Sequence, residues 1–138
     1  MVQMHVWAIV GLLLSGLICC SCGDASLFQD KPSAVVKKMY VACNTREYST
    51  AAGFLTAATK KIVNDTAVVE GGMKRACDQG SRRGTITSIE LKSESIRTLG
   101  ATVVVDIHFK DSSVKKNDIN ELIEENGIWK VTQAPGSK

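Results

Sequence analysis

The spacing of apolar residues changes once along this chain, and that change limits the folds available to it. Before about residue 85, apolar residues recur every three or four positions, as they do along one face of an α-helix. After that point they alternate with polar residues, and β-branched side chains become common, as in half-buried β-strands. Helices followed by strands are typical of an α+β domain. We therefore predict N-terminal helices packed on an antiparallel sheet.

Three helices are expected. The first covers residues 32–44, with Pro32 in its first turn, where a missing N–H costs nothing. The second covers 47–55. The third runs over 59–70 until Gly71 and Gly72 interrupt it, at about 1 kcal/mol per glycine relative to alanine, and resumes up to Gly80. Their expected apolar faces comprise Val35, Val36, Met39, Tyr40 and Cys43; Tyr48, Ala51, Ala52, Phe54 and Leu55; and Ile62, Val63, Ala67, Val68, Met73, Ala76 and Cys77.

Four strands follow, at 85–96, 101–110, 115–125 and 127–133. The second has the clearest pattern, because alternate residues from Ala101 to Phe109 are all apolar. Turn residues separate the strands, and the Asn126-Gly127 step is a strong hairpin signal. Three successive hairpins predict a four-stranded antiparallel meander.

The N-terminus predicts export and attachment to a membrane. Residues 1–23 contain no Asp, Glu, Lys or Arg, and the apolar run at 6–20 is shorter than the about 20 residues of a membrane-spanning helix. With Ser21 before Cys22, the segment resembles a bacterial lipoprotein signal, in which the cysteine carries lipid, including palmitate, on the mature protein. Cys22 fits that pattern better than Cys20; an uncleaved signal anchor is the alternative. We expect a signal peptide at 1–21, a linker at 22–31 and a folded domain at 32–134.

Cys43 and Cys77 are the two cysteines of the predicted domain. An oxidising compartment allows them to form a disulfide, which in the chain-entropy model contributes about 3 to 4 kcal/mol. Two buried, unpaired thiols remain the alternative, because spacing in the sequence does not show whether the two residues lie within reach. No second Cys or His stands at ligand spacing from either residue, so we predict no metal site.

Three segments carry a resemblance to a known family. They are PSAVVKKMYVACNTREY at 32–48, ITSIELKSESIRTLGATVVVDIHFKD at 86–111 and NELIEENGIWKV at 120–131. Together they resemble a nuclear transport factor 2-like domain of unknown function found in small bacterial lipoproteins. The resemblance covers about residues 30–133. It implies a cone in which three helices pack on a curved four-stranded sheet.

Enzymes of that superfamily place Asp, His or Tyr in the mouth of the cone. Asp106 and His108 share one strand face, opposite the apolar face, so they could form an acid and base pair or a polar flank facing solvent. Tyr40 and Tyr48 fall on apolar helical stripes and are expected in the core. Trp129 shares its strand face with Val131, as a core residue or as the floor of a ligand cavity. These five residues are weak candidates for ligand or partner contact.

A net charge of +3, spread along the chain, argues against nucleic acid as a partner. No Ser-His-Asp arrangement or phosphate-binding glycine loop is found, and we predict no cofactor. The primary expectation is a non-enzymatic binding or scaffolding module, lipid-anchored in the bacterial cell envelope, with an envelope protein or a second copy as its partner. The alternatives are a carrier of a small apolar ligand and an isomerase-like or hydrolase-like enzyme using Asp106 and His108.

Overall fold

The structure of the chain is a computed structural model that describes residues 29–65, 69–81 and 84–136. The predicted signal peptide, Cys20 and Cys22 and most of the predicted linker lie outside these ranges. Within the described residues, no helix has the length and apolar character needed to cross a membrane.

Helices precede strands, as the sequence predicts. The helices are α1 (Pro32–Asn44), α2 (Tyr48–Gly53), α3 (Ala57–Asp65) and α4 (Val69–Gly80). The strands are β1 (Ile86–Arg97), β2 (Gly100–Phe109), β3 (Val114–Glu125) and β4 (Ile128–Val131). The α+β class is therefore confirmed.

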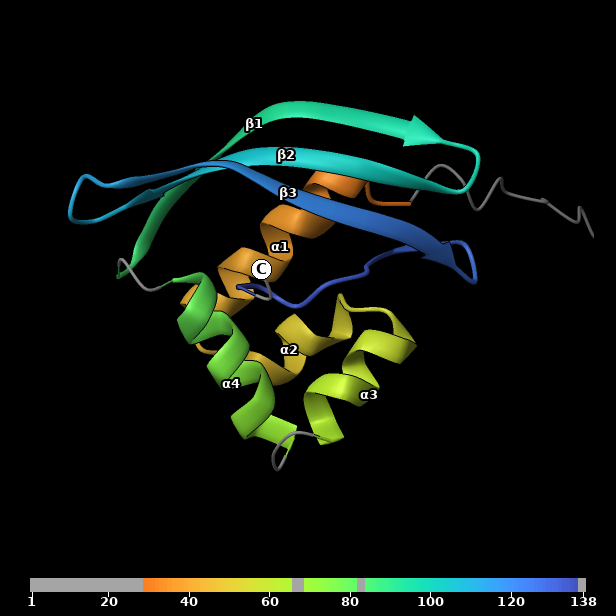
Figure 1. The fold of residues 1–138 in the computed structure, drawn as a ribbon, viewed down its shortest axis with the longest axis horizontal. Helices are drawn as coiled ribbons and strands as arrows, with labels where there is room; N and C mark the ends of the chain where they lie inside the picture. Colours follow the sequence, from red (N-terminus) through yellow and green to blue (C-terminus); the bar gives the residue numbers. More distant parts are fainter. Residues whose placement is uncertain (1–28, 66–68, 82–83, 137–138) are drawn as a thin grey trace, which may run out of the picture.

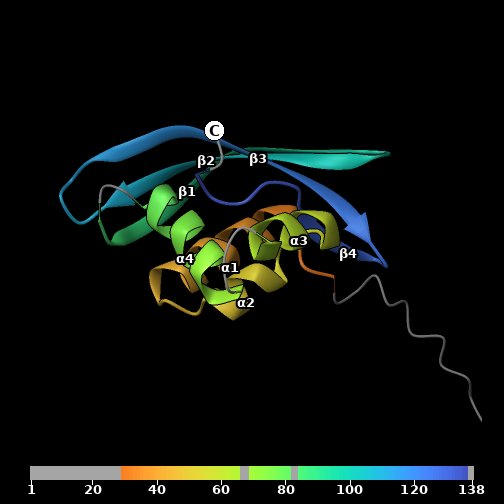
Figure 2. The same ribbon diagram turned by 60° about the horizontal axis from the view of Figure 1, so that its bottom comes forward.

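The four strands form one antiparallel sheet in the order β1-β2-β3-β4, which confirms the predicted meander (Figure 1). The turn between β3 and β4 places Asn126 at φ 52° and Gly127 at φ 77°, the left-handed backbone that this pair of residues tolerates well. On β2, Val103, Val105 and Ile107 are completely buried, as their alternation predicts. All four helices lie on this side of the sheet, which we call the inner face (Figure 2).

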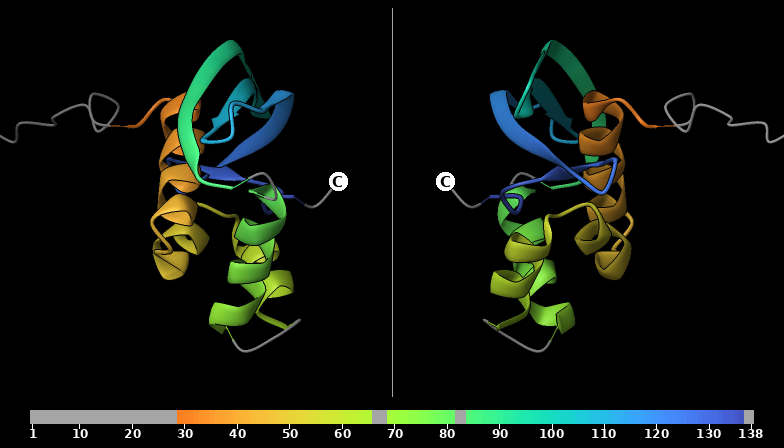
Figure 3. Two further views of the ribbon diagram at one scale, coloured as in Figure 1. Left: turned by 90° about the vertical axis from the view of Figure 1, so that its left-hand side faces the viewer. Right: turned by 90° about the vertical axis from the view of Figure 1, so that its right-hand side faces the viewer.

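Helix α1 packs directly on the inner face and contacts β1, β2 and β4. The side chains of Val36 and Met39, fully buried, and of Tyr40 fill the space between this helix and the sheet. The chain after β4 crosses between the sheet and helices α2, α3 and α4, which lie beyond it (Figures 1 and 3). The buried side chains of the helices and of the sheet form one continuous core.

Strand β4 is held on both of its edges. It pairs with β3, and Val131 also forms a parallel bridge with Leu55 in the loop after α2. The Val131 N–H donates to Phe54 O at 2.8 Å, and the Thr56 N–H donates to Val131 O at 2.9 Å. These bonds attach the helical layer to the sheet.

The prediction of a single third helix is wrong in its details. The structure has two helices there, α3 and α4, and Gly71 and Gly72 lie inside α4. A Cβ atom on Gly72 would lie 2.0 Å from the Val63 carbonyl oxygen, so glycine at this position lets α4 approach α3 closely. Val63 is buried as expected, whereas Ile62 is 66% exposed; Ala67 and Val68 are not among the described residues.

Candidate functional site

The inner face of β3 starts with polar residues and becomes apolar further along. Asp118, Asn120 and Leu122 alternate with exposed residues, and all three are at most 7% exposed. Asp118 lies opposite Val105, and Asn120 lies opposite Val103, so both side chains project toward α1. A carboxylate and an amide are thereby placed inside an otherwise apolar interface.

Three donors surround the Asp118 carboxylate. The Tyr40 hydroxyl, on α1, donates to Oδ2 at 2.6 Å, and Asn120 Nδ2 donates to the same oxygen at 3.0 Å. Lys115 Nζ lies 2.5 Å from Oδ1. Both carboxylate oxygens therefore have partners, as a buried charge requires. We call Tyr40, Lys115, Asp118 and Asn120 the polar cluster.

The contacts within the polar cluster determine the protonation states of Asp118 and Tyr40. Burial alone would raise the pKa of Asp118, but hydrogen bonds from Lys115, Tyr40 and Asn120 outweigh burial and hold that pKa below its ordinary value. Burial, together with the neighbouring Asp118 charge, raises the pKa of Tyr40 well above its ordinary value. At neutral pH Asp118 is therefore ionised and Tyr40 is protonated.

A hollow of about 210 Å³ opens beside the polar cluster. Besides the cluster, its lining includes Gln79 at the end of α4 and Gln133 in the C-terminal segment. The side chain of Lys115 is 35% exposed, so solvent reaches the rim. The polar groups accessible to a partner here are the Lys115 ammonium and the amides of Gln79 and Gln133, whereas Tyr40, Asp118 and Asn120 are each at most 7% exposed.

Asp106 and His108 lie on the other face of the sheet, away from the helices, as their alternation with Val105 and Ile107 predicts. Asp106 is not a solvated side chain, because only 8% of it is exposed. Its Oδ1 accepts the Asn117 N–H at 2.8 Å, at a bulge in the pairing of β2 with β3. His108 Nε2 lies 3.5 Å from Glu90 Oε2. Each residue thus has its own partner outside the polar cluster.

The remaining candidates are spread over the fold. Tyr40 belongs to the polar cluster, and Tyr48, on α2, packs half-buried against the core. Trp129 also packs half-buried against the core and lines a hollow of about 490 Å³, together with Gln29 and Phe54. That hollow lies where the described chain begins. Tyr40 and Trp129 therefore line separate hollows.

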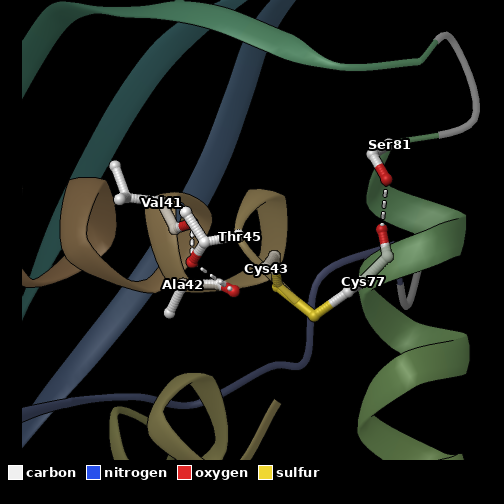
Figure 4. Close-up of a disulfide and its surroundings, with 6 residues drawn as sticks. All are labelled: Val41, Ala42, Cys43, Thr45, Cys77 and Ser81. Carbon is white, nitrogen blue, oxygen red and sulfur yellow. Dashed lines mark hydrogen bonds between the residues drawn. A yellow bond between two sulfur atoms is a disulfide. The ribbon is translucent and has the colours of Figure 1, made fainter. Parts of the chain in front are cut away.

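The disulfide between Cys43 and Cys77 is present and joins the end of α1 to α4 (Figure 4). The two Cα atoms lie 5.2 Å apart, and both residues are buried in the core. The alternative of two unpaired thiols is therefore wrong. In the part of the chain that the structure describes, no group of three or more His, Cys, Asp or Glu side chains is placed to hold a metal ion.

Sequence reasoning missed Lys115, Asp118 and Asn120. A signal for two of them was present, because Asp118 and Asn120 share the parity of the apolar Leu122 in a predicted strand. Extending that parity backwards would have placed both on the inner face. Lys115 does not share it, so no comparable signal marked that residue.

No protein-family model and no curated protein matches the sequence. Among solved structures, one neighbour is a Campylobacter jejuni protein described as a nuclear transport factor 2-like transpeptidase. It has 14% identity and a TM-score of 0.57, over 75% of this chain and 98% of that one. A SEC-C motif-containing protein of Rhodopseudomonas palustris has 9% identity and a TM-score of 0.54, over 78% and 79%. At these identities the similarity concerns the fold alone, and the fold of this chain is nuclear transport factor 2-like.

Proposed function

We propose that the protein is a non-enzymatic binding module, anchored in the bacterial cell envelope by lipid on Cys22. In this proposal, α1 and the sheet act as the cone of the fold. The polar cluster at its mouth receives a polar segment of an envelope protein. The observation that carries the proposal is the state of Asp118 and Tyr40.

Acid and base catalysis works best when the pKa of each group lies near the working pH. In the polar cluster both pKa values are shifted away from neutral pH, because the pKa of the Asp118 carboxyl is lowered and the pKa of the Tyr40 hydroxyl is raised. Asp118 is a weak base and Tyr40 a weak acid at neutral pH. Such a pair favours a fixed hydrogen bond between Tyr40 and Asp118 over proton transfer.

The proposed location rests on two features. Residues 1–23 lack charged side chains, and Ser21-Cys22 follows the apolar run. The Cys43–Cys77 disulfide is of a kind that persists in oxidising compartments outside the cytoplasm. Both features agree with a domain that faces the periplasm or the exterior.

The direction of α1 is consistent with a domain that holds the polar cluster away from the membrane anchor. Its first residue, Pro32, follows the start of the described chain, and its last turn lies near the polar cluster, which Tyr40 joins. Thirteen helical residues span about 20 Å. A domain anchored through the residues before Pro32 therefore holds the polar cluster at the end of α1 farther from the anchor.

The two alternative functions, a carrier of a small apolar ligand and an enzyme, have less support from the described residues than a binding module has. Met39, Tyr40 and Met73 are at most 2% exposed and fill the interior, so a carrier of apolar ligands would have to use a hollow at the surface, such as the one at Trp129. The name of the Campylobacter jejuni neighbour suggests peptidyl transfer. Cysteine-based transfer needs a free thiolate, which Cys43 and Cys77 cannot supply while they are bridged.

The anchor is tested by intact mass and membrane fractionation of the full chain in a bacterial host. We expect lipid mass on the wild type, the same mass on Cys20→Ala apart from the substitution, and none on Cys22→Ala. A wild-type chain without lipid would refute the anchor. Loss of lipid only in Cys20→Ala would move the anchor to that residue.

The binding site is tested by placing a photo-crosslinking side chain in cells at Gln133, beside the polar cluster, and in a second strain at Ser95 on the outer sheet face. We expect a discrete adduct from Gln133, weakened by Lys115→Ala and unchanged by Glu121→Ala, which alters an exposed side chain on the outer face of β3. The mass of the adduct separates an envelope protein from a second copy. An equal yield of adduct from Ser95, or a yield from Gln133 that Lys115→Ala does not change, would contradict binding at the polar cluster.

A further inference from the structure

The two ends of the sheet differ in the chemistry of their turns. In an antiparallel meander the first and third turns lie at one end and the second at the other. The first turn, between β1 and β2, carries Leu99, which is 90% exposed, beside Ile96, which is 60% exposed. The third turn, between β3 and β4, is followed by Ile128, which is 55% exposed. The second turn consists of Asp111, Ser112 and Ser113.

The described chain begins at the end with the apolar turns. Gln29 and Asp30 line the same hollow as Asn126, Gly127 and Ile128. Ser33, in the first turn of α1, is hydrogen-bonded to Glu94, close to the first turn of the sheet. Figure 1 shows the start of α1 and both of these turns at the right-hand end of the molecule. We call the turns with Ile96, Leu99 and Ile128 the apolar tips.

Charges of both signs occur at this end. Arg97 and Lys31 are exposed there. Carboxylates lie nearby as well: Asp30 pairs with Lys38, whereas Glu94, which accepts from Ser33, and Glu125, which accepts from the Ala57 N–H, keep their negative charge. Glu124 is the exposed carboxylate next to the third turn. Docking on the headgroup region of a bilayer would therefore depend on the exposed apolar side chains, with Arg97 and Lys31 able to contact lipid phosphates.

The length of the intervening chain limits how far this end can lie from the proposed anchor. Seven residue steps separate Cys22 from Gln29, and a fully extended chain of that length spans about 25 Å at most. The apolar tips therefore stay close to any bilayer that holds lipid on Cys22, whereas the Asp111–Ser113 turn lies at the opposite end of the sheet.

We propose that the apolar tips dock on the bilayer that holds the anchor, with Leu99 and Ile128 at the level of the headgroups. This inference rests on the proposed lipid anchor. Docking fixes the orientation of the domain, so that the polar cluster faces away from the membrane. Trp129, half-buried in the hollow beside Gln29, lies at the same end, in keeping with the preference of tryptophan for membrane interfaces.

The test uses the full lipidated chain in vesicles of phosphatidylethanolamine and phosphatidylglycerol that contain brominated lipids, which quench nearby tryptophan. Leu99→Trp reports on the apolar tips, and Lys110→Trp, an exposed position at the opposite end, is its matched control. Trp129 is common to both proteins, and Trp7 lies in the predicted signal peptide, which is absent from the lipidated chain. We expect quenching of the new tryptophan in Leu99→Trp and none in Lys110→Trp.

A second comparison isolates the contribution of one apolar side chain. Ile128 and Val41 are both 55% exposed, and Val41 lies on α1 away from the apolar tips. In the Leu99→Trp background we expect Ile128→Ser to lower the ratio of docked to undocked protein about tenfold, as the loss of one buried aliphatic side chain implies. Val41→Ser should leave that ratio unchanged.

The outcomes separate the anchor from the docking. A chain that neither carries lipid nor floats with vesicles overturns both proposals. A chain that floats but shows equal quenching at Leu99→Trp and Lys110→Trp keeps the anchor and overturns the docking. If Leu99→Ser converts a dimer in solution to a monomer and quenching is absent, the apolar tips bind a second copy, and membrane docking is wrong.

Discussion

Asp118 is a buried carboxylate whose charge depends on three neighbours from two elements. Tyr40 on α1, and Lys115 and Asn120 on β3, each contribute one contact to its oxygens. Removing any one of them leaves a buried charge with fewer partners, which costs more than the lost bond alone. The residue therefore links the stability of the interface between α1 and the sheet to pH.

The sign of this dependence follows from the lowered pKa of Asp118. A carboxyl with a lower pKa in the folded than in the unfolded state stabilises the fold above its unfolded pKa, near 3.9. That stabilisation is lost as the pH falls through the folded pKa. We expect the stability advantage of wild type over Asp118→Asn to be largest at pH 6 to 7 and to shrink below about pH 4.

Urea denaturation at several pH values measures this difference. Glu121→Gln, on an exposed carboxyl of the same strand, controls for the loss of one negative charge. A difference between wild type and Asp118→Asn that stays constant from neutral to acid pH would contradict the assignment of an ionised Asp118.

At the level of elements, the start of α1 depends on a residue far away in the sequence. Lys31 at the N-cap makes no side-chain hydrogen bond to the helix. Glu94 on β1 provides the missing side-chain cap. Glu94 Oε2 accepts from Ser33 Oγ at 2.8 Å, and Glu94 Oε1 accepts from the Ser33 N–H at 3.4 Å. A carboxylate at a helix N-terminus also interacts favourably with the helix dipole. The sheet thereby caps the helix that covers it.

We expect Glu94→Ala to lower the free energy of unfolding by about 1 kcal/mol, as the loss of an N-cap does. The loss should be less than additive with Ser33→Ala in a double-mutant cycle, because both changes remove the same contact. Chemical denaturation of the four proteins measures the coupling. Additive losses would show that Glu94 and Ser33 do not act together.

Two glycines with opposite surroundings test the packing of α4 on α3. Alanine at Gly72 would place its Cβ 2.0 Å from Val63 O, so we expect Gly72→Ala to destabilise the fold by about 1 to 3 kcal/mol. A Cβ at Gly53 would meet no atom within 4 Å, so Gly53→Ala should be neutral or stabilising by up to about 1 kcal/mol. Thermal unfolding of both variants makes the comparison. Equal effects would refute the close approach of the two helices.

At the scale of the whole molecule, the disulfide joins α1, which packs on the sheet, to α4, which lies farther from the sheet. Cys43 belongs to the helix that packs on the sheet, and Cys77 belongs to α4 in the layer beyond, 34 residues later. The crosslink limits the unfolded chain across a loop that includes α2 and α3. It therefore acts on the relative placement of the layers as well as on the entropy of the unfolded state.

We expect the double variant Cys43→Ala/Cys77→Ala to be about 3 to 4 kcal/mol less stable than the oxidised wild type. Reductant should lower the melting temperature of the wild type toward that of the variant. The variant itself should not respond to reductant. If reductant does not change the melting temperature of the wild type, the disulfide does not stabilise the fold.

The order of the elements and the meander followed from the sequence alone. The spacing of Val35, Met39 and Cys43 predicted α1, and the alternation from Ala101 to Phe109 predicted β2 and its buried face. The Asn126-Gly127 step predicted the third turn. These features depend on neighbours only a few residues apart, so local spacing carries the information.

The tertiary structure decided which polar residues meet. Tyr40 and Asp118 are 78 residues apart in the sequence, and the residues around either one do not predict its contact with the other. Alternation assigns a residue to a face only while the pairing stays regular. A bulge, with Asn117 at φ 54°, adds a residue on β3 between Lys115 and Asp118, so both lie at inner positions despite opposite parity. The sequence alone therefore determined the class and topology of the fold, and the packing of α1 on an irregular strand determined the polar cluster.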